Sequence, residues 1–203
     1  MDDLTADKLA IQEVVNNWVI WSDSGDWERF ATMWHDDAWM TATWFQGPAA
    51  EFARARRAGF ERGVSIIHFL GAVTCDIAGK RAIAQTKMTI NQRASVDGHV
   101  VDVVCMGRFY DFFEKRDRWA IARRQPIYEK DRLDSVEPGV KLVLDGALLG
   151  KFPEGYRHLG YLQTKAGFNV RLGLPGLRGP EVAKLYAEGK AWLDGAAQTG
   201  EPL

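Results

Sequence analysis

Apolar residues in the first third of the chain recur every three or four positions, which is typical of helices that bury one face. Thr5 and Asp26 are residue types that cap helices, and Pro48 suits the first position of one. We therefore predict a helix from Thr5 to the polar turn at 22–26, a short helix from Asp26 to 35–37, a strand over 38–45, and a helix from Gly47-Pro48 to about Arg62.

From Ser65 onward the pattern changes to the alternation of apolar and polar residues that strands show. The dipeptide Asp97-Gly98 is a strong signal for a two-residue hairpin turn. The predicted strands are 66–76, 81–96, 99–115 and 118–127. This order of elements, without a βαβ pattern, predicts an α+β fold in which a curved, mostly antiparallel sheet and the leading helices enclose a conical pocket.

The chain changes character after Tyr128, where turn-forming Gly and Pro residues become frequent. We predict a domain over 1–128 and a C-terminal extension over 129–203 that packs on it, because the extension has too little apolar content to fold alone. A final amphipathic helix is expected over 180–194, beginning at Pro180.

Composition and charge exclude several classes of protein. The 203 residues include 26 Lys and Arg against 27 Asp and Glu, so no basic track for nucleic acid or for a membrane surface is present. The acidic start, Met1-Asp2-Asp3, is unlike a signal peptide, and two cysteines are typical of a reducing cytoplasm. Eight tryptophans are the unusual feature, since large indoles fill a core or line an aromatic site.

The common sequence motifs for phosphate binding and for serine hydrolysis do not occur in this chain. Its four histidines are far apart in sequence, so we expect neither a metal site nor a cofactor. Acid–base chemistry remains, and its candidates are His68, inside an apolar run, and Asp23, at the end of the first predicted helix. The pattern alone favours a core histidine and a turn aspartate over a catalytic pair.

Four segments of the chain resemble the SnoaL-like group of the NTF2-like superfamily, in particular scytalone dehydratase and the hexachlorocyclohexane dehydrochlorinase. These segments are AIQEVV at 10–15, DSGDW at 23–27, WHDDA at 34–38 and HFLG at 68–71. The resemblance covers about residues 5–128 and implies a curved sheet whose helices form a conical pocket. The tryptophan-rich chain with its extension is also similar to the diarylpropane γ-formaldehyde lyase of sphingomonads.

The resemblance implies that Asp23 and His68 form the buried dyad of this family. Such dyads catalyse eliminations without a cofactor: the histidine moves the proton and the aspartate orients the histidine. Two tyrosines that hold a water in scytalone dehydratase correspond to Ser22 and Ala42, and its second histidine corresponds to Asn91. We therefore expect the same class of mechanism on a different substrate.

Polar residues on the predicted strands are candidates for binding substrate oxygens, Arg123 among them. Alternation places Lys87 and Asn91 on one face and Arg108 and Tyr110 on one face, but does not decide which face is inside. Clustered aromatic residues predict an aromatic substrate, with core packing as the alternative. The candidate substrate-binding residues are Asn91, Tyr110, Arg108, Lys87, Trp18, Trp44, Phe69 and Phe109.

Three functions stay open at this point. The preferred one is a cofactor-independent lyase that removes water, with or without formaldehyde, from a hydrophobic phenolic alcohol such as a lignin-derived diarylpropane. The second is isomerase or epoxide-hydrolase chemistry, which needs a second inward carboxylate such as Asp102 or Asp111. The third is a non-catalytic module for ligand binding or assembly. A homo-oligomer of two or three copies, without nucleic acid or membrane as partner, is expected.

Overall fold

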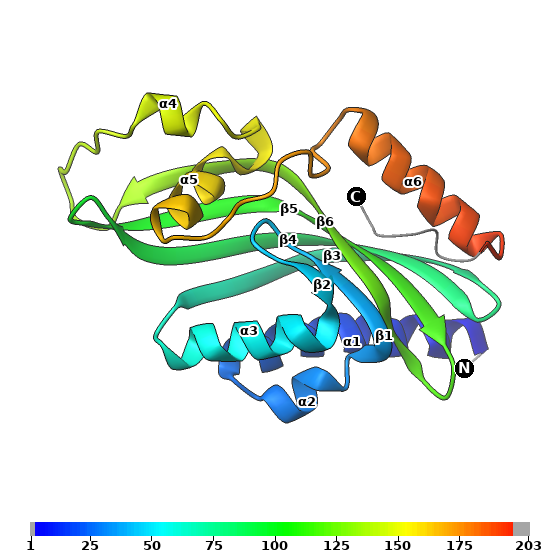
Figure 1. The fold of residues 1–203 in the computed structure, drawn as a ribbon. Coiled ribbons are helices and arrows are strands. Elements are labelled where there is room, and N and C mark those ends of the chain that lie inside the picture. The colour runs from blue at the N-terminus through cyan, green and yellow to red at the C-terminus, as the bar shows by residue number, and fades with distance from the viewer. Residues whose placement is uncertain (1–2, 197–203) are drawn as a thin grey trace.

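The computed structural model describes residues 3–196, in which six strands form one curved sheet (Figure 1). The strand order is β2-β1-β6-β5-β4-β3; β1 runs parallel to β6, and every other neighbouring pair is antiparallel. The strands are β1 (Trp34–Thr41), β2 (Gln46–Pro48), β3 (Ser65–Ala78), β4 (Arg81–Val96), β5 (His99–Lys115) and β6 (Trp119–Ser135). The predicted α+β fold with its antiparallel meander is confirmed.

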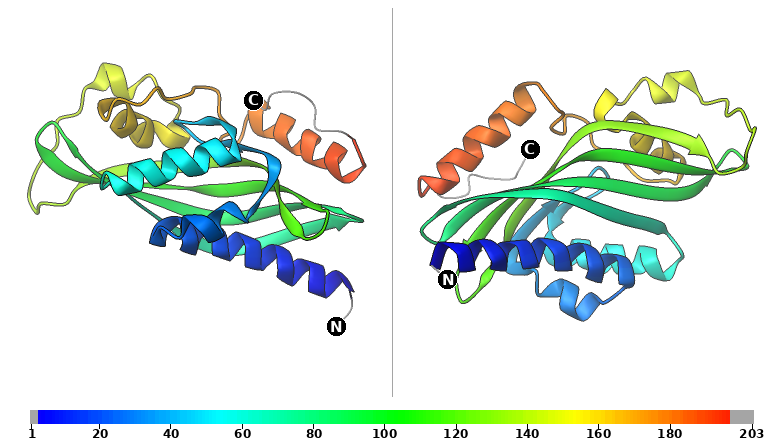
Figure 2. Two further views of the ribbon diagram at one scale, coloured as in Figure 1. Left: turned by 60° about the horizontal axis from the view of Figure 1, so that its bottom comes forward. Right: turned by 180° about the vertical axis from the view of Figure 1, so that it is seen from behind.

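Helices cover both faces of the sheet. They are α1 (Asp3–Ser24), α2 (Trp27–Ala31), α3 (Ala49–Glu61), α4 (Gly146–Leu149), α5 (Arg157–Lys165) and α6 (Pro180–Leu193), with a 3₁₀ turn at Glu154–Tyr156. Helices α1 and α6 lie on opposite faces, as the views in Figure 2 show. Helix α1 contacts β3 and β6, α5 contacts β4, β5 and β6, and α6 contacts β4. None of the helices in the described part of the chain has the length and apolar character that crossing a lipid bilayer demands.

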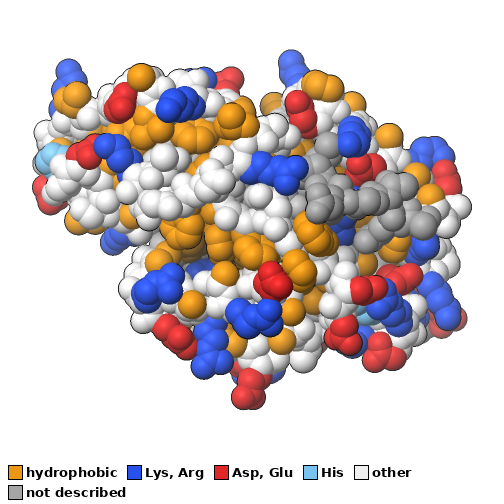
Figure 3. All heavy atoms as spheres, in the orientation of Figure 1, with side chains coloured by type: hydrophobic (Ala, Val, Ile, Leu, Met, Phe, Trp, Pro, Cys, Tyr) orange, Lys and Arg blue, Asp and Glu red, His pale blue; other side chains and the backbone are white. Residues whose placement is uncertain are grey.

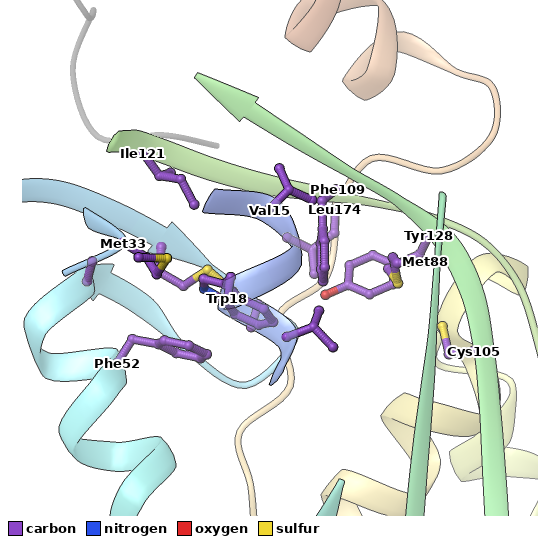
Figure 4. Packing of buried hydrophobic residues seen from close by; sticks show 14 of the residues in the cluster. Val15, Trp18, Met33, Phe52, Met88, Cys105, Phe109, Ile121, Tyr128 and Leu174 are labelled. Atoms are coloured by element: carbon purple, nitrogen blue, oxygen red, sulfur yellow. The ribbon is translucent and has the colours of Figure 1, made fainter. Parts of the chain in front are cut away.

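The main hydrophobic core lies between the concave face of the sheet and helices α1 and α3. Figure 4 shows Trp18 of α1 beside Phe52 of α3, with Phe109 and Tyr128 reaching in from the sheet. Burying a side chain of this size contributes roughly 2–3 kcal/mol of transfer free energy. A second cluster joins α6 to the convex face through residues such as Phe112 and Trp192. The two clusters therefore attach helices to opposite faces of one sheet.

Local signals placed several elements correctly. Asp26 caps α2, because its carboxylate accepts a hydrogen bond from the backbone N–H of Arg29. Asp97 and Gly98 form the turn between β4 and β5 with φ angles of 50° and 85°, as the two-residue hairpin requires. Helix α1, by contrast, begins at Asp3, so Thr5 lies inside it and is not its cap.

Several predicted boundaries were wrong, and one strand was missed; the short helix α2, for example, ends at Ala31 and not at 35–37. Strand β1 spans Trp34–Thr41 and not 38–45. Trp34 pairs with Ile121 of β6, and the residues predicted to close the short helix lie in the irregular stretch of β1 between Trp34 and Trp39. Strand β6 continues to Ser135, well beyond the predicted end at 127. Pro126 and a bulge opposite Met106 and Gly107 interrupt the alternation there, although the strand resumes beyond them. The short strand β2 was not predicted.

Candidate active site

Asp23 and His68 lie next to each other at the concave side of the sheet. Asp23 is near the C-terminal end of α1, and His68 is on β3. The Nδ1 atom of His68 is 2.9 Å from Oδ1 of Asp23, and the backbone N–H of His68 donates to Oδ2 at 2.5 Å. The side chains are 8% and 15% exposed. A carboxylate at Nδ1 holds the ring proton there, so that Nε2 carries the free lone pair.

Arg56 of α3 is the third charged member of this cluster. Its Nη2 donates to the carbonyl oxygen of Ile66 at 3.0 Å and lies 3.5 Å from Oδ1 of Asp23. Only 4% of the Arg56 side chain is exposed. Burial lowers the pKa of Arg56, and the charge of Asp23 opposes this change. The guanidinium therefore connects α3 to Asp23 and to the start of β3.

A narrow cavity begins at His68 and runs between α3, α5 and the sheet. About 40 Å³ is open to water there, and an adjoining hollow of about 30 Å³ shares Trp44, Arg56, Ile66, Gln92 and Gln163 with it. Figure 3 shows hydrophobic side chains gathered in the hollow between the region of α5 and the region of α3. This space holds only a few waters, so a larger ligand enters only if wall side chains move.

Aromatic rings surround the imidazole of His68. Trp18 stands edge-on to it with 5.4 Å between ring centroids, and Phe109 is at 6.2 Å. Phe52 stacks on the other side of Trp18 at 6.4 Å. Rings of this kind exclude water, which strengthens the electrostatic interaction between His68 and Asp23. The arrangement provides an oriented base in a largely apolar environment.

The second inward carboxylate, Asp111, is already engaged. Both of its oxygens accept hydrogen bonds from Arg124, at 2.6 and 2.7 Å, and both side chains are fully buried. The Arg124 guanidinium lies over Trp18, 4.3 Å from the ring centroid, and thus behind the cavity wall. Asp102 forms an exposed ion pair with Arg93. Neither aspartate is among the residues that line the cavity.

A chain of three polar side chains, of which Gln163 belongs to α5 and Gln92 to β4, forms part of the cavity wall. The Thr43 hydroxyl donates to Oε1 of Gln163 at 2.5 Å, and Nε2 of Gln163 donates to Oε1 of Gln92 at 3.2 Å. All three side chains are buried and line the cavity. The sequence prediction did not include Gln92, Gln163 or Arg56. Arg56 follows Phe52 by one helical turn on the buried side of α3, and this spacing is the signal that could have found it.

Among the predicted aromatic residues, Trp18, Trp44 and Phe109 line the cavity. Phe69 does not, because alternation along β3 places it on the face opposite His68, where it is 73% exposed. The expectation that Phe69 contacts a ligand in this cavity is therefore corrected.

The predicted polar residues also lie on the opposite face of the sheet. Lys87 and Arg108 both form ion pairs with Glu129 there, at 2.7 Å, and Arg108 also donates to the hydroxyl of Tyr186 on α6. Asn91 alternates with the cavity residue Gln92 and so points away from His68. These positions correct the expectation that Asn91, Lys87 and Arg108 bind substrate oxygens in the cavity.

Tyr110 and Arg123 belong to the contact between the convex face and α6. The Tyr110 ring packs on Tyr186, with 5.5 Å between centroids, and burial raises the pKa of Tyr110 to about 12. Arg123 pairs with Glu188 at 2.7 Å. Both side chains attach a helix, which corrects their prediction as substrate ligands.

Comparison with known proteins identifies relatives along nearly the whole chain. A PEP2-like protein of Fusarium vanettenii is 35% identical over 206 residues, which cover 96% of this chain and 88% of the relative. Pea pathogenicity protein 2 of the same fungus is 34% identical over 207 residues, with coverage of 96% and 88%.

Solved structures show the same fold at low sequence identity. A type 2 hexachlorocyclohexane dehydrochlorinase matches with a TM-score of 0.55 and 16% identity, over 71% of this chain and 97% of the other. A Novosphingobium aromaticivorans protein with a provisional scytalone dehydratase assignment matches with a TM-score of 0.54 and 15% identity, over 68% and 97%. The fold is that of the NTF2-like superfamily. Residues 3–125 match the family model for the SnoaL-like domain, and the chain therefore belongs to that family.

Proposed function

We propose that this protein is a cofactor-independent lyase in which His68 is the general acid–base and Asp23 orients it. The observation that carries the proposal is the 2.9 Å contact between Nδ1 of His68 and Oδ1 of Asp23 beside an aromatic cavity. The SnoaL-like family and a fold shared with dehydrochlorinases and a provisionally assigned dehydratase support the same class of reaction.

The reaction balances without an added oxidant or reductant. Nε2 of His68 takes a proton from the carbon next to the one that carries a hydroxyl group. A carbon–carbon double bond forms as the carbon–oxygen bond breaks, and protonated His68 returns its proton to the departing hydroxyl, which leaves as water. Asp23 stabilises the imidazolium that exists between these two proton transfers.

The proposed substrate is a hydrophobic aromatic alcohol, such as a phenolic diarylpropane derived from lignin. The rings of Trp18, Trp44 and Phe109 support this choice, because they offer edges and faces for stacking. In a phenolic diarylpropane, the phenolic proton and the benzylic hydroxyl leave together as water and give a quinone methide. The quinone methide then accepts the electron pair of the neighbouring carbon–carbon bond as that bond breaks; the hydroxymethyl group loses its O–H proton and leaves as formaldehyde, and the ring oxygen takes up a proton to become a phenol again.

Two other features belong to this proposal. We expect a homo-oligomer of two or three copies, for which the exposed Ile67 and Phe69 on strand β3 supply an apolar surface. We also expect the cytoplasm as the location, since Cys75 and Cys105 are both free thiols.

Two alternatives have less support. Epoxide-hydrolase or isomerase chemistry with a second carboxylate is disfavoured, because both oxygens of Asp111 are engaged by Arg124 and Asp102 faces solvent. A function limited to ligand binding does not explain why a buried histidine is held by a carboxylate beside the cavity. The lyase accounts for this pair directly.

The test is mass spectrometry of phenolic benzylic alcohols and diarylpropanediols after incubation with the purified protein alone. We expect products lighter by water, or by water and formaldehyde, and a loss of turnover by about two to four orders of magnitude in His68→Asn. His158→Asn is the matched control, because Nδ1 of His158 contacts Asp131 at 2.8 Å but His158 does not line the cavity. Unchanged turnover in His68→Asn would contradict the assignment.

A further inference from the structure

The guanidinium of Arg56 is buried without enough partners. Its Nη2 has the Ile66 carbonyl at 3.0 Å and Asp23 at 3.5 Å, whereas Nη1 has no hydrogen-bond partner within residues 3–196. Arg56 lines both the cavity at His68 and the adjoining hollow. A buried charged donor without an acceptor is costly, and native proteins seldom keep one unless something else supplies the acceptor.

Asp23 does not neutralise Arg56 well, because its oxygens serve His68 first. The two hydrogen bonds from His68 to Asp23 are 2.5 and 2.9 Å long, while the Arg56 contact is at the outer limit of a hydrogen bond. Burial has the largest effect on the pKa of Arg56 and lowers it, while the charge and hydrogen bond of Asp23 oppose this change. An anionic oxygen in the cavity would provide the acceptor that Nη1 lacks.

We propose that the cavity binds an organic carboxylate, one oxygen of which accepts a hydrogen bond from Nη1 of Arg56. The surrounding wall suits the rest of such a molecule, because Trp44, Ile66 and Ile90 are apolar. This inference deepens the proposed function and rests on it in one respect: within the proposed class of aromatic alcohols, the substrate whose reacting carbon lies at His68 is one that also carries a carboxylate.

The test compares carboxylates with amides of nearly the same shape. 2-Butenoate and benzoate are each titrated beside their amides, with tryptophan fluorescence as the signal because Trp18 and Trp44 line the cavity. We expect the wild-type protein to bind each carboxylate about tenfold or more tightly than its amide at pH 7. Equal affinity for carboxylate and amide in both pairs would overturn the proposal.

Variants of Arg56 assign the preference to that residue. Arg56→Gln should lower carboxylate affinity about tenfold and leave amide affinity unchanged, while Arg56→Lys, which keeps a positive charge, should retain part of the preference. Arg54→Gln is the control, since Arg54 is exposed on the same helix. Circular dichroism checks that each variant folds; if Arg56→Gln does not, the wild-type comparison alone decides. A preference that persists in folded Arg56→Gln would also overturn the proposal.

His68→Asn separates this inference from the lyase proposal. If the carboxylate site is right, the variant keeps the preference for carboxylates whether or not His68 carries the reaction. If the lyase proposal is right and the carboxylate site is wrong, turnover depends on His68 while carboxylates and amides bind equally. The two proposals therefore fail through different measurements.

Discussion

His68 depends on Asp23 in two ways, through its ring and through its backbone. One carboxylate oxygen holds Nδ1 and the other accepts the N–H of the same residue, so the imidazole and the strand are positioned by a single side chain. An asparagine at position 23 can keep at most part of this arrangement, because its side-chain amide has only one accepting oxygen and carries no charge. It also leaves Arg56 without its only anionic neighbour in the cluster.

We therefore predict that Asp23→Asn lowers kcat by about 10² to 10⁴, because the imidazolium formed during turnover loses its stabilising charge. The same variant should unfold at a lower temperature than the wild type. Steady-state kinetics on the substrate found by mass spectrometry, together with thermal unfolding, would check both effects. A variant that keeps its kcat and loses only thermal stability would make Asp23 a purely structural residue.

At this scale the sequence predicts some site residues and not others. Asp23 and His68 could be named because short segments around them resemble a family, although their spacing could not show that they meet. The substrate-binding residues could not be predicted in the same way. The alternation of side chains along a strand places Asn91 and Gln92 on opposite faces of the sheet, but it does not decide which of them faces the helices. Arg56 was missed because an arginine among other charged residues on a helix is usually solvated.

At the scale of elements, Asp7 connects the beginning of α1 to the hairpin between β5 and β6. Its carboxylate accepts hydrogen bonds from Lys115 Nζ at 2.6 Å and from the Trp119 indole at 2.8 Å. The hydrogen bond from Lys115, followed by that from Trp119, holds the pKa of Asp7 below its ordinary value of 3.8. Asp7 therefore stabilises the fold above about pH 3.8, and this contribution is lost as the pH falls through the lower, folded-state pKa.

We predict that Asp7→Asn lowers the urea midpoint at pH 7 and pH 5 by similar amounts. The gap between variant and wild type should shrink toward zero as the pH falls from about 3.8 through the lower, folded-state pKa of Asp7, because the carboxylate then becomes neutral in the folded protein as well. Urea unfolding at several pH values would measure this, with the exposed Asp36→Asn as control. A gap that stays constant down to the lowest pH would rule out a role for the charge of Asp7.

Elements with strong local signals were predicted well, and elements that depend on distant partners were not. The hairpin at Asp97 and Gly98 follows from two residues whose backbone preferences suit the turn. Residues 34–37 looked like the end of a helix because their place in β1 depends on the pairing of Trp34 and of Trp39 with β6, far along the chain. The distal part of β6 is specified in the same way, by its register with β5.

At the scale of the whole molecule, β3 forms one edge of the sheet and exposes Ile67 and Phe69 on its outer side. If these side chains form the contact between copies, Phe69→Lys should shift the molar mass toward the 22.8 kDa of one chain, because a charge would have to be desolvated in the interface. Light scattering after size-exclusion chromatography measures the mass, and Val143→Lys, at another exposed apolar position, is the control. An oligomer unaffected by Phe69→Lys would place the interface elsewhere.

The parallel pairing of β1 with β6 has a consequence for how the chain acquires its fold during synthesis. Trp34 pairs with Ile121, so β1 finds its partner in the sheet only after the last strand has left the ribosome. Until then, the tryptophans of β1 lack the strand that holds them in the sheet. Non-local pairing of this kind makes folding slow and leaves apolar surface open meanwhile. The nascent chain is therefore expected to be a chaperone client until translation passes β6.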